Sequence, residues 1–218
     1  MAIGDKGILE KITIVLLIAA LLVIGFNAFQ IGQLKGKNNA NTPITAQAVA
    51  ENNPVNSEVV DLNIIPKGMP NLYGNEMGVS FDDVSSSNQA KADAAINKLG
   101  ILDQQITLNG KDKERYIAVA GKISCEYCCG VESIIFSNGN AACGCAHSFA
   151  MRGLAKYLIK NHGSEYTDDK ILEELGKWKT LFFPSKIAAK AKILKDKGIE
   201  LSYINLASNK YRGIENPN

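Results

Sequence analysis

All five cysteines of this chain lie in one segment, and that segment constrains the local fold more than any other feature. Its first half reads Cys125-Glu126-Tyr127-Cys128-Cys129-Gly130, and its second half reads Cys143-Gly144-Cys145-Ala146-His147. Thiolate and imidazole groups must converge on one point to hold a soft metal ion, and short spacings bring them together at low entropic cost. The two halves therefore predict a metal or redox site, for which the candidate ligands are Cys125, Cys128, Cys129, Cys143, Cys145 and His147.

The residues between the two halves predict a small β-hairpin. Residues 131–136 form a plausible strand, and Ser137-Asn138-Gly139-Asn140 is typical of a hairpin turn. The returning strand would place Cys143 and Cys145 opposite the first pair. Cys125-x-x-Cys128 with Gly130 close behind resembles the knuckle of zinc-ribbon proteins, in which the glycine frees backbone amides to point at the sulfurs. Local structure, and not spacing alone, is thus expected to close the site.

Several chemistries are open to these donor groups. Zinc is the first expectation, and a structural zinc site would use four thiolates, or three thiolates and one imidazole. Copper(I) or an iron–sulfur cluster would explain the surplus ligands better. A thiol–disulfide centre could instead use Cys125 and Cys128, with Cys129 or Cys145 as the resolving residue. The remaining alternative is a pair of structural disulfides with one spare thiol, since an odd number of cysteines cannot all pair internally.

Cys143-Gly144-Cys145 with His147-Ser148 close behind resembles the exported bacterial proteins named for a Pro-Cys-Tyr-Cys-Gly-Cys motif. Those proteins are similar also in following the motif with helical sequence. Here Ala141-Ala142 stands where that motif has Cys-Tyr, and no cysteine is placed for lipid attachment. The resemblance implies an exported, cysteine-rich, metal-linked protein and no particular activity.

The N-terminal part of the chain predicts a membrane anchor. Residues 12–34 carry no charged side chain, and such a stretch is long enough to cross a hydrocarbon core of about 30 Å as a helix. A cleaved secretory signal would have a shorter apolar core and a small-residue cleavage site, which Gly25-Phe26-Asn27-Ala28-Phe29 does not offer. We therefore predict a short tail over 1–11, a single-pass transmembrane helix over 12–34 and a cell-membrane location. A short tail is more easily kept in the cytoplasm than exported, so the folded part is expected to be extracytoplasmic.

The rest of the chain predicts a linker, one domain and a tail. Residues 35–56 are rich in Asn, Ala, Thr and Gln without an aromatic residue, which predicts a flexible linker. Residues 57–207 predict a soluble, mainly helical domain in which the β-hairpin is the metal-binding element, and residues 208–218 predict a loose tail. Apolar periodicity and capping residues predict helices over 85–99, 112–123, 148–161, 167–182 and 185–197, with a strand over 116–120 as an alternative.

The charged residues of the chain give little information about its binding partners. A formal net charge of +2 is too small to indicate nucleic-acid binding. A group of lysines is expected to form a solvated helix face, or else a face for anionic lipid or an acidic protein partner: Lys177, Lys179, Lys186, Lys190, Lys192, Lys195 and Lys197. The partners predicted from the sequence are the membrane, a metal ion and a further protein.

Two functional hypotheses follow, and they leave open whether the protein is an enzyme. The first is a membrane-anchored extracytoplasmic protein that uses its cysteine cluster for soft-metal binding, transfer or structural stapling. Its ligands would be Cys125, Cys128, Cys143 and Cys145, with Cys129 and His147 as alternates. The second is a thiol–disulfide oxidoreductase at the membrane surface, with a reactive thiolate at Cys125 helped by Lys122. No Gly-rich phosphate loop, Gly-x-Ser-x-Gly or His-Glu-x-x-His motif points to another enzyme class.

Overall fold

The computed structural model describes residues 62–216. The predicted tail, anchor and linker (1–11, 12–34 and 35–56) lie outside these residues, as do the first residues of the predicted domain. Among the helices of the described part, none is long and apolar enough to cross a membrane.

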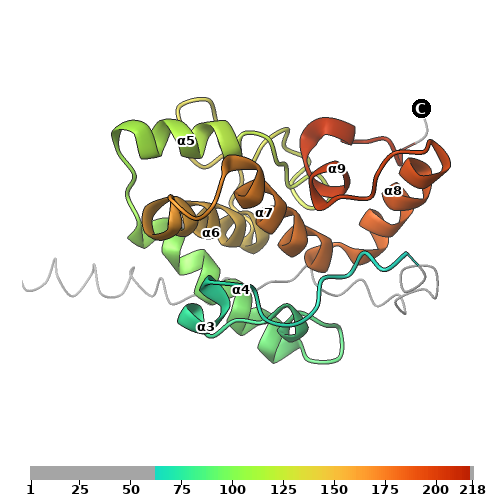
Figure 1. The fold of residues 1–218 in the computed structure, drawn as a ribbon, viewed down its shortest axis with the longest axis horizontal. Helices are drawn as coiled ribbons and strands as arrows, with labels where there is room; N and C mark the ends of the chain where they lie inside the picture. Colours follow the sequence, from blue (N-terminus) through green and yellow to red (C-terminus); the bar gives the residue numbers. More distant parts are fainter. Residues whose placement is uncertain (1–61, 217–218) are drawn as a thin grey trace, which may run out of the picture. The chain divides into compact units, whose positions relative to one another are not determined.

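The described residues form a mainly helical domain, as the sequence predicts (Figure 1). Their seven α-helices are α3 (Tyr73–Met77), α4 (Gln89–Gln105), α5 (Gly110–Ala120), α6 (Ala146–His162), α7 (Asp168–Phe182), α8 (Pro184–Asp196) and α9 (Tyr203–Ala207). Two short 3₁₀ turns, η1 (Phe81–Asp83) and η2 (Asn209–Tyr211), complete the set. In Figure 1, α6 and α7 lie at the centre, α5 and α4 lie on opposite sides of them, and α8 and α9 lie at one end. Helix α5 confirms the helical prediction for its segment over the alternative strand.

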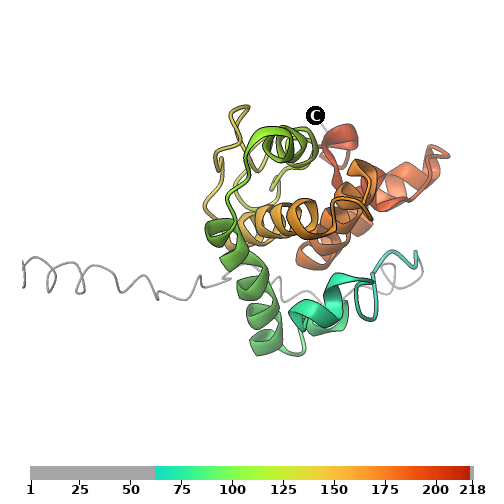
Figure 2. The same cartoon turned by 60° about the vertical axis from the view of Figure 1, so that its left-hand side comes forward.

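Helix α4 crosses α6 at close range (Figure 2). Gly153 of α6 permits this approach, because a Cβ atom at that position would overlap the carbonyl oxygen of Leu99. Gly100 of α4 also faces α6, with the Cβ of Phe149 3.4 Å from where its own Cβ would lie. The predicted bounds of this helix were wrong at both ends. The helix begins after Asn88, which caps it with its side chain. It continues past Gly100, which allows the close contact between the two helices and does not end α4.

Helix α7 supplies the centre of the core and follows its predicted course. Thr167 accepts a hydrogen bond from a backbone N–H of the first turn and so caps the helix, as expected. Trp178 is fully buried, and its ring centroid lies 5.4 Å from that of Phe81 and 6.1 Å from that of Phe182. Its indole N–H donates to the Tyr73 hydroxyl at 2.8 Å, which ties α3 to α7.

The predicted β-hairpin does not form, because the described residues contain isolated bridges but no strand. The chain does reverse at the expected turn, where the Phe136 N–H donates to the Asn140 carbonyl oxygen at 2.8 Å. The Ile134 N–H instead donates to the Ile123 carbonyl oxygen at 3.0 Å, outside the expected pair of strands. One bridge, between Ile135 and Ala141, is all that joins the two segments as a ladder, and a lone two-stranded ladder is marginal in water.

Residues 208–216, predicted as the start of a loose tail, are packed beside the cysteine segment. The Asn209 side-chain amide donates to the Glu132 carbonyl oxygen at 2.8 Å, and the Arg212 guanidinium donates to the Gly130 carbonyl oxygen at 2.9 Å. The tail prediction was therefore wrong for this stretch. Its polar composition resembles that of a free tail, but its hydrogen bonds go to groups that are distant in sequence.

Candidate metal centre

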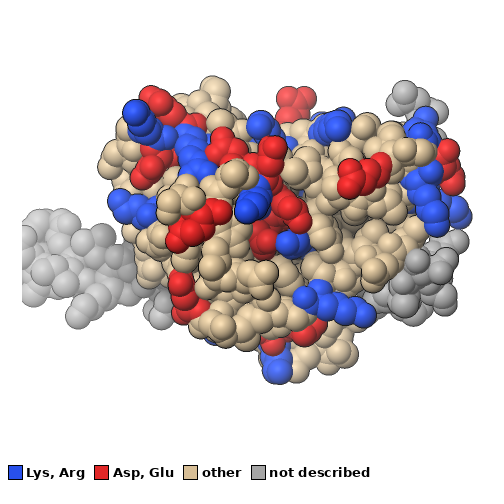
Figure 3. Space-filling model, in the orientation of Figure 1, with Lys and Arg blue, Asp and Glu red and all other residues tan. Residues whose placement is uncertain are grey.

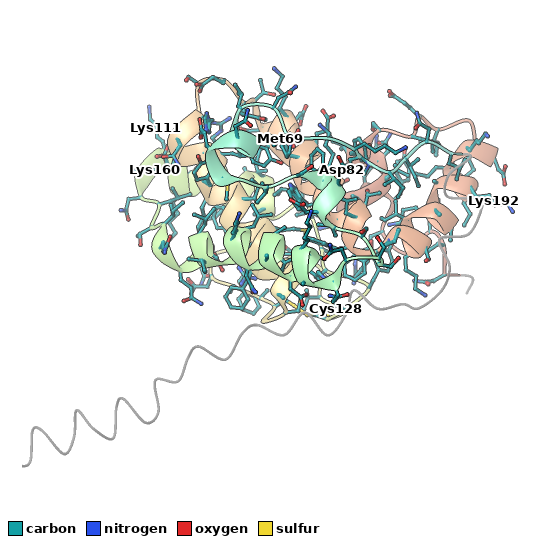
Figure 4. All side chains as sticks on the ribbon, turned by 90° about the horizontal axis from the view of Figure 1, so that it is seen from below. Met69, Asp82, Lys111, Cys128, Lys160 and Lys192 are labelled. Carbon is teal, nitrogen blue, oxygen red and sulfur yellow. A yellow bond between two sulfur atoms is a disulfide. The ribbon has the colours of Figure 1, made fainter. Side chains whose placement is uncertain are left out.

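A backbone turn brings the first two candidate cysteines together. The N–H groups of Cys128 and Cys129 donate to the carbonyl oxygen of Cys125 at 3.3 and 3.0 Å. Gly130 then continues the chain with a φ of 67°, in the left-handed region that favours glycine. Cys125 is buried, whereas Cys128 is exposed and lies at the edge of the molecule in the view of Figure 4. The turn therefore presents one inner and one outer thiol.

The start of α6 adds a third cysteine. Cys145 is the N-cap of this helix, and its sulfur accepts a hydrogen bond from the Ser148 N–H at 3.4 Å. Its Sγ lies 3.3 Å from the Sγ of Cys125. The hydrogen bond from Cys125, opposed by burial and helped by the nearby His147 and Ser148, lowers the pKa of Cys145 to about 3. A helix N-terminus also favours a thiolate.

The same contact has the opposite effect on Cys125. Its hydrogen bond to Cys145, together with burial, raises the pKa of the Cys125 thiol. The contact therefore favours the thiolate at Cys145 and the thiol at Cys125. Burial and this contact disfavour a thiolate at Cys125, where the hypothesis placed the reactive group with help from Lys122.

His147 lies in the first turn of α6, with its side chain buried. It is 1% exposed, and its ring centroid lies 4.7 Å from that of Phe182 and 4.9 Å from that of Phe183. Neither of its ring nitrogens has a hydrogen-bond partner among residues 62–216. Leaving a buried polar group without a partner costs about 1–3 kcal/mol. A metal ion bonded to one of these nitrogens would remove much of that penalty.

The other two cysteines, Cys129 and Cys143, form a disulfide bond with their Cα atoms 6.4 Å apart. Arg152 of α6 holds one side of this bridge, because its Nη1 donates to the Cys143 carbonyl oxygen at 2.8 Å. The same guanidinium is 1% exposed and pairs with Asp103 at 2.7 Å. Because Cys129 and Cys143 are joined, neither is a free thiol that could bind a metal ion. The predicted ligand set of Cys125, Cys128, Cys143 and Cys145 therefore includes one cysteine, Cys143, that is not free in this state.

The structure brings all six candidate residues into one cluster. Two overlapping groups have ligand atoms within 4.8 Å of one another: Cys125, Cys128, Cys145 and His147 in one, and Cys125, Cys129, Cys143 and Cys145 in the other. Three thiolates with one imidazole, and four thiolates, are both ligand sets of structural zinc sites, and thiolates also suit copper(I). The cluster can therefore hold a soft metal ion.

Behind the cysteine turn lies a buried group of charged residues that the sequence did not predict. The Glu126 carboxylate lies 2.9 Å from the Nζ of Lys179 and 3.0 Å from the Nζ of Lys190, and both lysine side chains are fully buried. Burial alone would raise the pKa of Glu126, but the two lysine charges outweigh it and hold that pKa below its ordinary value. Burial lowers the pKa of Lys179 to about 8, although Glu126 opposes the change. The turn between the first cysteines is thus fixed from the inside by two cations.

Burial of Lys179 and Lys190 corrects the expectation that they belong to a solvated lysine face. A signal for it was present in the sequence. Lys179 follows Leu175 by four residues and precedes Phe182 by three, which places it in the apolar stripe of α7. Lys190 follows Ile187 by three residues and falls in the stripe of α8 in the same way. On the face of the molecule shown in Figure 3, Lys and Arg side chains alternate with Asp and Glu.

Fold and site together define a mainly helical domain with a cysteine cluster that can hold a metal ion. In comparisons with protein-family models, with curated proteins and with solved structures, none matched this chain. The resemblances to zinc-ribbon knuckles and to proteins with the Pro-Cys-Tyr-Cys-Gly-Cys motif stay predictions. The functional proposal therefore depends on the chemistry of the site itself.

Proposed function

We propose that this chain is a membrane-anchored, extracytoplasmic protein that binds one soft metal ion. Its ligands are Cys125, Cys128, Cys145 and His147, and the Cys129–Cys143 disulfide braces the site. The ion is zinc, with copper(I) as the second candidate. The role of the site is to capture the ion and transfer it.

The environment of His147 carries this proposal. Two phenylalanine rings fix the imidazole, no residue in the described part bonds its nitrogens, and three free cysteines lie within ligand distance of one another and of it. Buried polar groups are normally paired, so an unpaired imidazole facing three thiols indicates a missing partner. A cation that accepts both sulfur and nitrogen ligands is the partner that this set selects.

The ligand set favours zinc. Three thiolates and one imidazole match a tetrahedral zinc site, in which Zn–S bonds are about 2.3 Å long. The lowered pKa of Cys145 favours its thiolate, which is the form that binds a metal ion. Iron–sulfur clusters are usually held by four thiolates. With Cys129 and Cys143 joined, the described cluster offers three free thiols.

The proposed location rests on the apolar stretch 12–34 and is supported by the disulfide. Disulfides form and persist outside the cytoplasm and are rare within it. A free thiol group beside a disulfide is compatible with such a compartment when a metal ion occupies the thiols.

Metal analysis with a parallel thiol count tests the proposal. The full-length chain is purified in detergent without added metal, and zinc and copper are measured by elemental analysis. We expect one metal ion per chain, three thiols that become reactive after chelation, and five after reduction. Less than a tenth of an ion per chain after reconstitution with zinc would contradict the proposal.

The chain offers a matched control, since it contains two histidines. His147→Gln should weaken zinc affinity by more than about 100-fold, because loss of even an outer-shell partner of a ligand costs 10–100-fold. His162→Gln should leave the affinity unchanged. His162 lies at the other end of α6, about 22 Å along the helix, and bonds Glu76 at 2.9 Å. Equal affinities of the two variants would remove His147 from the site.

A thiol–disulfide oxidoreductase is the second candidate function, and the low pKa of Cys145 favours it. The Cys145 sulfur lies within 4.8 Å of the sulfurs of Cys129 and Cys143. A thiolate at that distance from a disulfide can attack it, forming one mixed disulfide and releasing the other sulfur as a thiolate. Catalysed reduction of a disulfide substrate by the metal-free protein with a dithiol, abolished by Cys145→Ser, would favour this function over metal transfer.

A further inference from the structure

The two groups of candidate ligands share the same central pair of sulfurs. Cys125 and Cys145 belong to both groups. Cys128 and His147 join the pair in one group, and the disulfide-bonded Cys129 and Cys143 join it in the other. The proposed function uses only the first group.

The distance between the shared sulfurs fits a bridging role. With metal–sulfur bonds of about 2.3 Å, two sulfurs on one tetrahedral ion lie about 3.8 Å apart. The Sγ atoms of Cys125 and Cys145 are 3.3 Å apart, so a shift of about half an ångström would make them a common edge of two tetrahedra. Each ion would then have two further ligands of its own.

We propose that reduction of the Cys129–Cys143 disulfide converts this centre from a one-ion site into a two-ion site. The thiolates of Cys125 and Cys145 bridge the two ions. Cys128 and His147 complete the first ion, and Cys129 and Cys143 complete the second. This inference rests on the proposed function, because it adds a second ion beside the one already assigned.

The redox step balances with a dithiol as the reductant. The S–S bond between Cys129 and Cys143 breaks and accepts two electrons and two protons, while the dithiol loses two hydrogens and closes its own disulfide. The two new thiols then lose their protons to solvent as they bind the second divalent ion.

Two arginines keep the second group in place when the disulfide opens. Arg152 donates to the carbonyl oxygen of Cys143 at 2.8 Å, and Arg212 donates to that of Gly130, next to Cys129, at 2.9 Å. Neither hydrogen bond depends on the disulfide. The two released thiols therefore stay beside the bridging pair.

The charge of the centre also stays constant. One divalent ion with three thiolates and a neutral imidazole carries a net charge of one minus (two plus, three minus). Two divalent ions with five thiolates and the same imidazole carry the same net charge (four plus, five minus). The buried charges of Glu126, Lys179 and Lys190 therefore face the same net charge in both states.

Native mass spectrometry of the untagged full-length chain in detergent tests the inference. Zinc is added in excess to the oxidised protein, and to protein reduced with dithiothreitol that is then removed without oxygen. We expect one zinc ion per chain in the oxidised protein and two in the reduced protein. One ion in both states overturns the inference and leaves the proposed function standing, whereas no ion in the oxidised protein overturns the proposed function.

A double variant and a second metal locate the second ion. Cys129→Ser with Cys143→Ser should hold one ion with or without dithiothreitol, and two ions in this variant would place the second ion elsewhere and overturn the inference. Cobalt(II) gives a readout that does not need the variant to fold. Thiolate bridges couple two cobalt ions antiferromagnetically, so the paramagnetic resonance signal per ion should fall as the reduced wild-type site fills. A signal that stays proportional to the cobalt bound would also overturn the inference.

Discussion

Replacing Glu126 by glutamine should strongly destabilise the domain, because two buried lysines depend on its charge. The carboxylate lies 2.9 Å from the Nζ of Lys179 and 3.0 Å from that of Lys190, and both lysine side chains are 0% exposed. Glu126→Gln keeps the shape of the side chain and removes the charge. Removing one partner of a buried ion pair typically costs about 3–5 kcal/mol, since an uncompensated charge stays behind.

The two lysines do not double this cost. Lys190 keeps the carboxylate of Glu215 at 3.6 Å, whereas Lys179 keeps the carbonyl oxygen of Ala207 at 2.8 Å. Most of the loss therefore falls on Lys179, and we expect the free energy of unfolding to fall by about 4 kcal/mol, within the range for one broken pair. With a urea dependence of about 2 kcal/mol per molar, the unfolding midpoint should fall by about 2 M.

Urea unfolding followed by tryptophan fluorescence measures this effect, because the chain has a single tryptophan, Trp178, and it is fully buried. Oxidised, metal-free, full-length protein in detergent is compared with Glu126→Gln and with Glu132→Gln. Glu132 is exposed, so the same substitution there should change stability by less than about 0.5 kcal/mol. A loss below about 1 kcal/mol for Glu126→Gln would refute the argument that these lysines are held as buried cations.

The comparison of the unsubstituted protein with Glu126→Gln also predicts how the free energy of unfolding depends on pH. Because the pKa of Glu126 is held below its ordinary value, its contribution to stability is fully present above about pH 4.5 and is lost as the pH falls through the lowered pKa. The deficit of Glu126→Gln should therefore narrow as the pH falls below about 4.5. A deficit that widens below pH 4.5 would contradict the assigned direction.

Two further predictions concern the helix crossing and the thiolate. Gly153→Ala should lower the free energy of unfolding by about 3 kcal/mol or more, because its Cβ would overlap the backbone of α4. Gly100→Ala, which meets only ordinary contacts, should be neutral or stabilising by up to about 1 kcal/mol in the same urea titration. In the oxidised, metal-free protein, iodoacetamide should modify Cys145 at nearly the same rate at pH 5 and pH 7, since its pKa is about 3. Cys128, whose pKa is raised by burial and by Cys145, should react appreciably only in alkali, and a tenfold rise per pH unit at Cys145 would contradict the assignment.

Helices in this domain could be predicted where a capping residue and an apolar stripe agree. Thr167 as the capping residue and the apolar stripe that includes Trp178 predicted the position of α7, and the structure confirms this prediction. The same reasoning failed at Gly100, because a glycine after an apolar stripe commonly ends a helix, and only the position of α6 shows that this glycine permits a close contact. The hairpin prediction failed for a related reason, since the Ile134 N–H donates to Ile123, outside the hairpin, and a single bridge joins the two segments.

The cysteine cluster could be predicted in outline and not in detail. Short spacings bring Cys125 and Cys128 together through one turn, and this much depends on local chain geometry alone. The pairing of Cys129 with Cys143 could not be predicted, because it depends on how α6 and the C-terminal segment hold the two backbones. The role of Cys145 as an N-cap was missed because cysteine is not among the preferred capping residues. The metal-ligand roles of these residues stay predictions.

How the cysteine segment is held bears on what a metal ion would do there. In small zinc domains the ion supplies the folding free energy, because little else orders the ligands. Here Arg152 and Arg212 bind carbonyl oxygens of the segment, two buried lysines bind Glu126, and a disulfide closes the remaining side. The free energy of metal binding is therefore not needed to order the segment, which argues against a purely structural staple. Under the proposed function, an ordered site with one exposed thiol, Cys128, would release or accept an ion by exchanging that ligand first, as transfer between proteins requires.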